Sequence, residues 1–199
     1  MNMAAAKRGG TVSDLARNLA VAEKMILLGA RPSIVSSMCG IHIRDARDYY
    51  EEIHGGRSPS GMQPFDSYWI LRSAHNCIHA SIFHGFYERM RREHAGHREA
   101  EIFVAAYKVY HGTVNNTADP IPADRRKGQE RLDINRAYYI VRQYRNKETV
   151  FENCPRCKSY YLVIANYPAA FRQCPLCEVW VDRTGRSRWR TVDIDYGEK

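Results

Sequence analysis

The sequence lacks the features that mark membrane proteins, secreted proteins and the common enzyme classes. It contains no apolar run of about eighteen residues, so no transmembrane helix is expected. Its first ten residues, MNMAAAKRGG, contain a basic patch but no apolar segment of the kind found in a secretory signal. None of the motifs GxxxxGK[ST], GxGxxG, GxSxG and HExxH occurs, and no two carboxylates have a spacing typical of a catalytic pair. We therefore expect a cytoplasmic protein that binds partners and is not an enzyme.

Negative charge is also in deficit. Thirty Lys and Arg outnumber twenty-two Asp and Glu, which gives a net charge of +8 and a pI near 9.3. This balance favours a polyanionic partner, because each Lys or Arg placed against a phosphate releases condensed counterions. The charge alone does not identify nucleic acid as that partner, since many basic proteins bind nothing acidic.

Four of the six cysteines lie within the segment NCPRCKSYYLVIANYPAAFRQCPLC, residues 153–177. Cys154 and Cys157 form one Cys-x-x-Cys pair, and Cys174 and Cys177 form another, with sixteen residues between the pairs. Two residues between thiols allow a tight turn to direct both sulfurs at one ion, and two such pairs at this separation are typical of zinc-binding modules. The sequence therefore predicts one structural Zn²⁺ per chain, held by all four thiolates.

Other uses of the thiols fit less well. A thioredoxin-like site needs one pair entering a helix, disulfides are rare in a reducing compartment, and a catalytic zinc keeps one coordination position open. We expect residues 160–167, YYLVIANY, to form a strand of a hairpin that brings the second pair beside the first, in a module spanning residues 148–182. Lys158 and Glu178 stand where many zinc-binding turns have glycine, a departure that concerns turn geometry and not ligation.

Upstream of the cysteines the apolar periodicity is helical, after a disordered lead-in expected at residues 1–11. We expect a helical body over residues 12–147. Its first helix should run from Val12 to Gly29, with one apolar stripe formed by Leu15, Leu19, Ala22, Met25, Ile26 and Leu27. Further helices are predicted over residues 71–91, 99–110 and 132–144, with loops over 54–65 and 115–126. The predicted fold class is mainly α: a helical body with a helix-turn-helix-like pair, followed by a small C-terminal four-cysteine zinc-binding module with short β-strands.

The helix-turn-helix-like pair is predicted between Pro32 and Gly55. One short helix should end at Gly40 and a second should follow it, with Val35, Met38, Cys39, Ile41 and Ala46 packed between them. Arg44 and Arg47 would then be exposed and able to reach phosphates or guanine edges. The pattern fits equally well two core helices joined by a glycine corner, with solvated arginines.

Two further groups of residues have a structural and a functional interpretation. Residues 183–199 form a basic tail in which Arg183, Arg186, Arg188 and Arg190 surround Trp189, an arrangement that suits a phosphate backbone and also suits a solvated terminus. His75 and His79 are one helical turn apart, but Cys77 between them would point away from their shared face. We expect these histidines to be hydrogen-bonded packing residues, and Cys39 and Cys77 to be buried.

The order of these segments resembles the FlhC family of bacterial flagellar transcriptional activators. The resemblance rests on LLGARPSIVSSMCGIHIRDARDYYEEIHG, then GMQPFDSYWI, then HASIF, then the two Cys-x-x-Cys pairs, and covers residues 12–190. It implies zinc binding through Cys154, Cys157, Cys174 and Cys177. It also implies a hetero-oligomer with the helical partner FlhD, which binds the promoters of flagellar operons and recruits RNA polymerase.

Two functions of different classes follow. The first is a zinc-containing, promoter-binding activator whose DNA contacts come from Arg44, Arg47 and the arginines of residues 183–190. The second is an adaptor whose zinc module and helical faces bind proteins, with the charge serving only solubility. Preference for one DNA sequence over another distinguishes the two.

Overall fold

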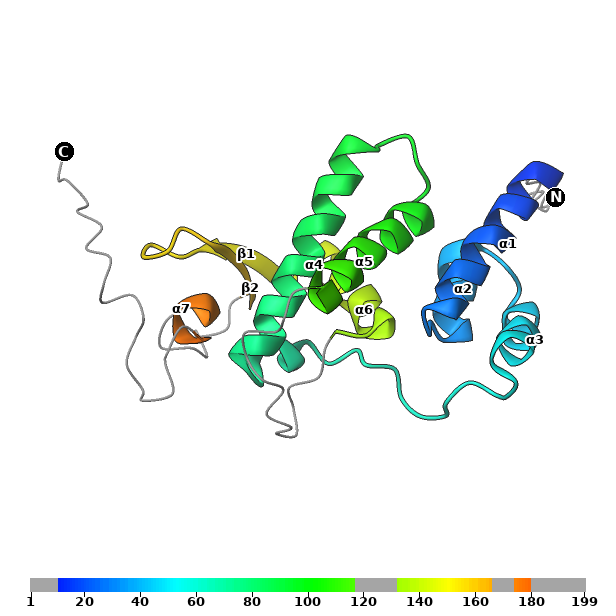
Figure 1. The fold of residues 1–199 in the computed structure, drawn as a ribbon, viewed down its shortest axis with the longest axis horizontal. Coiled ribbons are helices and arrows are strands. Elements are labelled where there is room, and N and C mark those ends of the chain that lie inside the picture. The colour runs from blue at the N-terminus through cyan, green and yellow to red at the C-terminus, as the bar shows by residue number, and fades with distance from the viewer. Residues whose placement is uncertain (1–10, 117–131, 166–173, 180–199) are drawn as a thin grey trace, which may run out of the picture.

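The computed structural model describes residues 11–116, 132–165 and 174–179 (Figure 1). These residues form α1 (Val12–Leu27), α2 (Pro32–Cys39), α3 (Ile43–His54), the 3₁₀ helix η1 (Ser67–Leu71), α4 (Ala74–Glu93), α5 (Glu99–Asn116), α6 (Ile134–Arg145), β1 (Thr149–Asn153), β2 (Tyr160–Ile164) and α7 (Pro175–Val179). The protein is thus mainly helical with a small C-terminal sheet, which confirms the predicted fold class. None of the helices in these ranges is long and apolar enough to cross a membrane.

Figure 1 shows three groups of elements along the long axis of the molecule. Helices α1, α2 and α3 lie at one end, and an extended connection leads from α3 to the central helices α4, α5 and α6. The hairpin of β1 and β2 lies beyond them, together with α7. Both β2 and α7 pack against α4, so this long helix links the cysteine-bearing end to the centre of the molecule.

Local sequence signals explain the ends of the first three helices. Thr11 and Asp14 form a reciprocal capping box that starts α1, and Pro32 occupies the first turn of α2. Gly40 ends α2 with a φ of 67°, and Gly55 ends α3 with a φ of 68°. Both values lie in the left-handed region that glycine enters without steric cost. The predicted break at Gly40 is therefore confirmed.

One continuous core joins the helices. Met25, Ile26, Val35 and Ala46 are buried between α1, α2 and α3. In the centre, rings from α4 and α5 pack edge to face; these are Phe83, Phe103, Tyr107 and Tyr110. Such pairs add to the stabilisation that comes from burying their area.

Leu162 of β2 belongs to the same core, and its backbone is bound by α4. The Leu162 N–H donates to Ser81 Oγ at 2.9 Å, and the Cys77 thiol donates to the Leu162 carbonyl at 3.1 Å. The hairpin is therefore fixed to the helical body by side chains of one helix as well as by apolar packing.

The apolar stripe predicted for the first helix is only half correct. Ala22, Met25 and Ile26 are buried, as expected. Leu15, Leu19 and Leu27 are exposed, with 55%, 39% and 62% of their surface accessible. In the N-terminal half of α1 the polar face is turned toward α5, because its side chains form ion pairs there.

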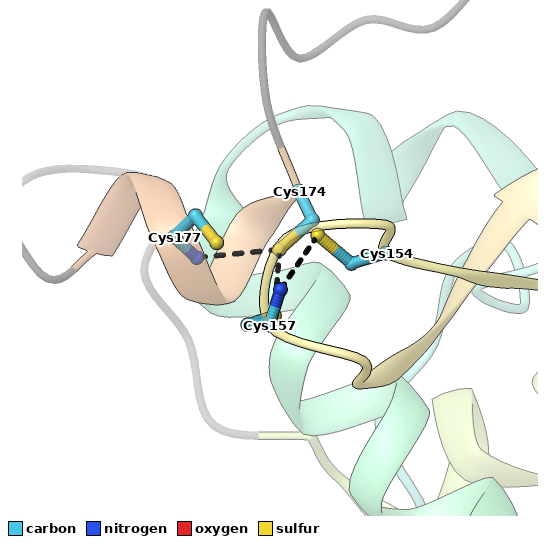
Figure 2. A group of neighbouring side chains, drawn as sticks. All are labelled: Cys154, Cys157, Cys174 and Cys177. Atoms are coloured by element: carbon cyan, nitrogen blue, oxygen red, sulfur yellow. Dashed lines mark hydrogen bonds between the residues drawn. The ribbon is translucent and has the colours of Figure 1, made fainter. Parts of the chain in front are cut away.

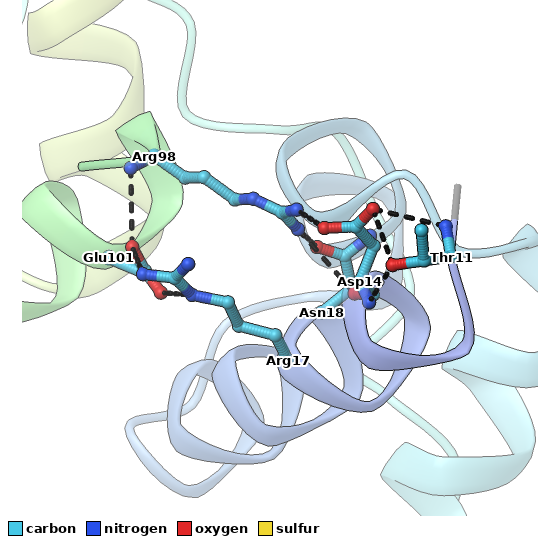
Figure 3. A network of polar contacts seen from close by, with 6 residues as sticks. All are labelled: Thr11, Asp14, Arg17, Asn18, Arg98 and Glu101. Carbon is cyan, nitrogen blue, oxygen red and sulfur yellow. Dashed lines mark hydrogen bonds and ion pairs between the residues drawn. The ribbon is translucent and has the colours of Figure 1, made fainter. Parts of the chain in front are cut away.

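These ion pairs form the network in Figure 3. Arg98 pairs with Asp14 and donates to the Asn18 side chain, and Arg17 pairs with Glu101. The Arg17 Nη2–Glu101 Oε2 distance is 3.0 Å. The network holds the N-terminal half of α1 against the start of α5, with the polar side of the helix facing inward.

Candidate metal centre

The first cysteine pair lies in the turn between β1 and β2. The strands are antiparallel, with Thr149 opposite Ile164 and Asn153 opposite Tyr160. The turn is closed by the N–H of Cys154, which donates to the Ser159 carbonyl, and by the N–H of Lys158, which donates to the Cys154 carbonyl, both at 2.9 Å. The strand predicted over residues 160–167 begins at Tyr160 as expected and ends at Ile164. The hairpin, however, surrounds the first pair rather than connecting the two pairs, because the strand that precedes Cys154 supplies its partner.

Lys158 adopts the backbone conformation that a glycine would adopt without strain. Its φ is 60°, in the left-handed region. The turn is completed by the Asn153 side-chain amide, which donates to the Lys158 carbonyl at 3.0 Å. The departure from glycine at this position therefore leaves the shape of the turn intact.

The second pair lies at the start of α7. Cys174 precedes this short helix, Pro175 is its first residue, and Cys177 is within its only turn. The backbone N–H of Cys177 donates to Cys174 Sγ at 3.3 Å, as the N–H of Cys157 donates to Cys154 Sγ at 3.5 Å. Both pairs thus use the same local geometry, in which the N–H of the second cysteine points at the sulfur of the first.

The four sulfurs converge (Figure 2). All four Sγ atoms lie within 4.8 Å of one another, and those of Cys157 and Cys174 are 3.4 Å apart. A tetrahedral Zn²⁺ with Zn–S bonds of about 2.3 Å requires S···S separations of about 3.8 Å. Cys154, Cys174 and Cys177 are buried, and all four are free thiols. The donor set and its spacing therefore fit a metal ion, and are compatible with zinc.

The electrostatics of the cluster favour a bound cation. Burial raises the pKa of Cys174 to about 11, and burial together with the neighbouring thiols raises the pKa of Cys177 as well. Burial also acts to raise the pKa of Cys157, but hydrogen bonds with Ser159 and the facing thiols outweigh it and lower that pKa to about 6. Without a cation the cluster can hold little negative charge, so a divalent ion is what allows all four sulfurs to ionise.

The two remaining cysteines are chemically different. Cys39 and Cys77 are buried as expected, and burial raises the pKa of Cys39 to about 11 and that of Cys77 to about 12. Both are therefore neutral thiols near neutral pH. Cys77 lies near the cluster, but its thiol is engaged with the Leu162 carbonyl.

His75 and His79 form part of a buried polar chain. Their Nε2 atoms are 2.9 Å apart, and the Tyr110 hydroxyl lies 2.8 Å from His79 Nδ1. In the described ranges, only the four cysteines bring three or more metal-ligating side chains together. The histidines thus occupy hydrogen-bonded packing positions, as the sequence predicts.

The two short helices are joined by a tight glycine turn, which fits both a helix-turn-helix and two core helices that meet at a corner. Three residues, from Gly40 to His42, separate α2 from α3, and Val35, Cys39, Ile41 and Ala46 are buried at their junction. Met38 is half-buried against the same core. Arg44 and Arg47 are exposed on α3, as predicted.

The exposed surface of α3 also carries acidic residues that the sequence interpretation did not weigh. These are Asp45, Asp48, Glu51 and Glu52. They outnumber the two arginines, so this surface as a whole is not basic. The sequence RDARDYYEE, residues 44–52, already shows this excess of acidic residues. Every charged residue of an exposed helix face contributes to the electrostatic potential of that face.

Positive charge is concentrated instead toward the C-terminus. Residues 117–190 contain fifteen Lys and Arg against eight Asp and Glu. Arg156 and Lys158 are exposed in the hairpin turn, on either side of Cys157. The predicted contacts Arg183, Arg186, Arg188 and Arg190 lie outside the described residues.

Comparison with known proteins identifies the family of the chain. The family model described as flagellar transcriptional activator (FlhC) matches residues 8–191. The flagellar transcriptional regulator FlhC of Variovorax paradoxus is 28% identical over 173 residues, which cover 86% of this chain and 79% of that protein. The protein of the same name from Proteus mirabilis is 28% identical over 163 residues, which cover 82% of this chain and 79% of that protein. The chain therefore belongs to the FlhC family of flagellar transcriptional activators.

Proposed function

We propose that this protein is a DNA-binding activator of flagellar operons, that it acts in a hetero-oligomer with an FlhD-like partner, and that one structural Zn²⁺ per chain holds its C-terminal module. The four-thiol cluster is the observation that carries the proposal. The chain belongs to a family of transcriptional regulators, and the cluster lies in the most basic part of its sequence. Recruitment of RNA polymerase in the cytoplasm completes the proposed role.

Cys154, Cys157, Cys174 and Cys177 would hold the metal. Bound zinc would supply a cross-link and neutralise the thiolates, and four protein ligands would leave no position for a substrate water. The hairpin turn and α7 bring no large apolar surface of their own to the cluster, where Tyr161 and Leu176 are the partly buried neighbours. The proposed role of the ion is therefore to fix residues 148–182 as a module on the helical body of residues 12–147.

The DNA contacts are proposed for two surfaces. Arg156, Lys158 and the arginines of residues 183–190 would neutralise phosphates and supply most of the affinity. Arg44 and Arg47 would position α3 or bind base edges, while the carboxylates beside them would oppose close approach to phosphate. This division assigns affinity to the C-terminal half and sequence preference to α3.

The test is fluorescence anisotropy with a flagellar promoter duplex and a scrambled duplex, at two salt concentrations, with and without the FlhD-like subunit. We expect tighter binding to the promoter, strengthened by the partner. Equal, salt-sensitive binding to both duplexes would contradict the proposal and would favour the protein-binding adaptor.

Paired variants test the division of roles. Arg156→Ala with Lys158→Ala should weaken both duplexes and reduce the salt slope by about one to two. Arg44→Ala with Arg47→Ala should reduce the preference for the promoter by roughly tenfold or more. Arg92→Ala, an exposed arginine on α4, is the control and should change neither.

A further inference from the structure

The N-terminal half of α1 has its apolar side turned to solvent and its polar side turned to the protein. Asp14, Arg17 and Asn18 face α5 and are held by Arg98 and Glu101 (Figure 3). At 100° per residue, Leu15 and Leu19 each lie about 160° around the helix from Arg17, on the other side. A surface helix that has no further binding partner would have the reverse orientation, with its apolar side toward the protein core.

The exposed apolar residues are contiguous on that face. Val12, Leu15, Ala16, Leu19, Ala20 and Leu27 are all exposed, and Val12 has 87% of its surface accessible. Val12, Leu15 and Leu19 continue into buried Ala22 and Ile26 with the alternating three- and four-residue spacing of a coiled-coil seam. The half of the seam near Ile26 is covered by the protein itself, and the half near Val12 is not.

The helix is fixed in this orientation rather than frayed. Thr11 and Asp14 close the capping box at its first turn, and the ion pairs to α5 act on the same two turns that carry Val12 and Leu15. A preorganised apolar seam of this kind fits the apolar face of another helix.

One charge on the face indicates the chemistry of the partner. Glu23 lies on the helix between Leu19 and Leu27, is exposed, and makes no ion pair with any described residue. The seam positions themselves contain no cation: exposed Lys24 flanks the face, about 100° from Glu23 around the helix, and Arg17 is paired with Glu101. A second copy of α1 packed through the same seam would therefore bring no cation at a seam position to Glu23, whereas a helix with Lys or Arg beside its apolar seam would.

We propose that the exposed half of the seam, Val12, Leu15 and Leu19, docks an apolar helix of a different protein, with a Lys or Arg of that helix against Glu23. This deepens the proposed function, on which it rests: the partner is the FlhD-like subunit of the hetero-oligomer. The ion pair sets the direction and register of the partner helix, and the leucines supply the affinity.

The test measures binding of the full-length protein to the purified FlhD-like subunit by calorimetry. Leu15→Ala with Leu19→Ala should weaken binding at least about 30-fold. Ser13→Ala with Lys24→Ala, on exposed positions outside the seam, should change it less than about threefold. Glu23→Gln should reduce the salt dependence of binding, and Glu23→Lys should weaken binding further than Glu23→Gln. Circular dichroism melts show whether each variant is folded, and all should be, since alanine favours helix at these exposed sites.

The outcomes separate the two proposals. Equal binding by wild type and the leucine variant overturns the seam and leaves the hetero-oligomer standing. Failure of the wild type to bind the subunit overturns the hetero-oligomer, and the seam proposal with it. If the wild type associates with itself in the absence of the subunit, and the leucine variant does not, the seam binds a second copy of this chain. That result would contradict the proposal of a different protein as the partner. Tighter binding after deletion of residues 1–10 indicates that this segment occupies the seam, which also contradicts the proposal.

Discussion

At the scale of single residues, His84 is an imidazole base in the core of the protein. It is fully buried, neither ring nitrogen has a hydrogen-bond partner among the described residues, and its ring centroid lies 4.2 Å from that of Tyr144. Burial lowers its pKa to about 4; Arg91 and Arg145 act in the same direction and Glu88 opposes them. The folded protein therefore keeps this imidazole neutral at pH values where an unfolded chain protonates it.

This pKa makes stability depend on pH. A histidine whose folded-state pKa lies below its ordinary value of 6.5 binds protons mainly in the unfolded state. Its contribution is complete above pH 6.5 and is lost as the pH falls toward 4. Between pH 7 and pH 4.5 the loss should be roughly 2 kcal/mol. Urea unfolding at both pH values measures it, and His84→Phe should lose less stability over this range by that amount. An identical loss in the variant would show that other groups cause the pH dependence.

The thiols give the second prediction at this scale. Cys174→Ser should reduce bound zinc from about one ion per chain to nearly none, because a serine hydroxyl is a poor ligand for Zn²⁺. Plasma emission spectrometry of the purified protein measures the metal. Cys39→Ala is the matched control, because the Cys39 thiol is buried in the helical core. This variant should bind as much zinc as the wild type. Full zinc in the serine variant would contradict the proposed ligand set.

The four-cysteine cluster could be predicted from the sequence because each Cys-x-x-Cys pair is local, so that one turn directs both of its sulfurs. The pKa of His84 could not. It depends on Tyr144 and Phe151, which lie some sixty residues away along the chain and meet the imidazole only in the folded protein.

At the scale of elements, glycine determines where the helix-turn-helix-like pair bends. Gly40 has a φ of 67° and open space around its missing side chain. Gly40→Ala should therefore destabilise the protein by about 1 kcal/mol through backbone strain alone. Gly85, within α4, also has open space and no such backbone, so Gly85→Ala should stabilise by about 0.5 to 1 kcal/mol. Urea unfolding should give opposite signs for the two variants, and equal signs would contradict the role assigned to Gly40.

The helices themselves were largely predictable. The bounds expected around Pro32, Gly40 and Gly55 agree with α2 and α3, since proline and glycine act through the local backbone. The sequence did not distinguish η1 from the start of α4. It also did not reveal which part of the α1 stripe is buried, because periodicity groups residues on one face without specifying what covers that face.

At the scale of the whole molecule, one long helix, α4, connects the four-cysteine cluster to the helical body. Because Leu162 lies in the common core and α7 packs on α4, loss of the metal should destabilise more than the hairpin. Treatment with a strong chelator should lower the Tm of the helical circular dichroism signal by several degrees or more. The Cys174→Ser variant should show no further change with chelator. An unchanged Tm in the wild type would show that residues 148–182 unfold independently of the body.

The hydrogen bonds from Ser81 and Cys77 to Leu162 have a further consequence. A sheet of two strands has two open edges, and each presents a row of N–H and C=O groups to which the strand of another molecule can add. Along the outer edge of β2, the central pair of these groups is already occupied by side chains of α4. Another polypeptide cannot extend the sheet there without displacing them. At this point of the edge, the bonds that fasten the hairpin to the body also protect the chain from aggregation.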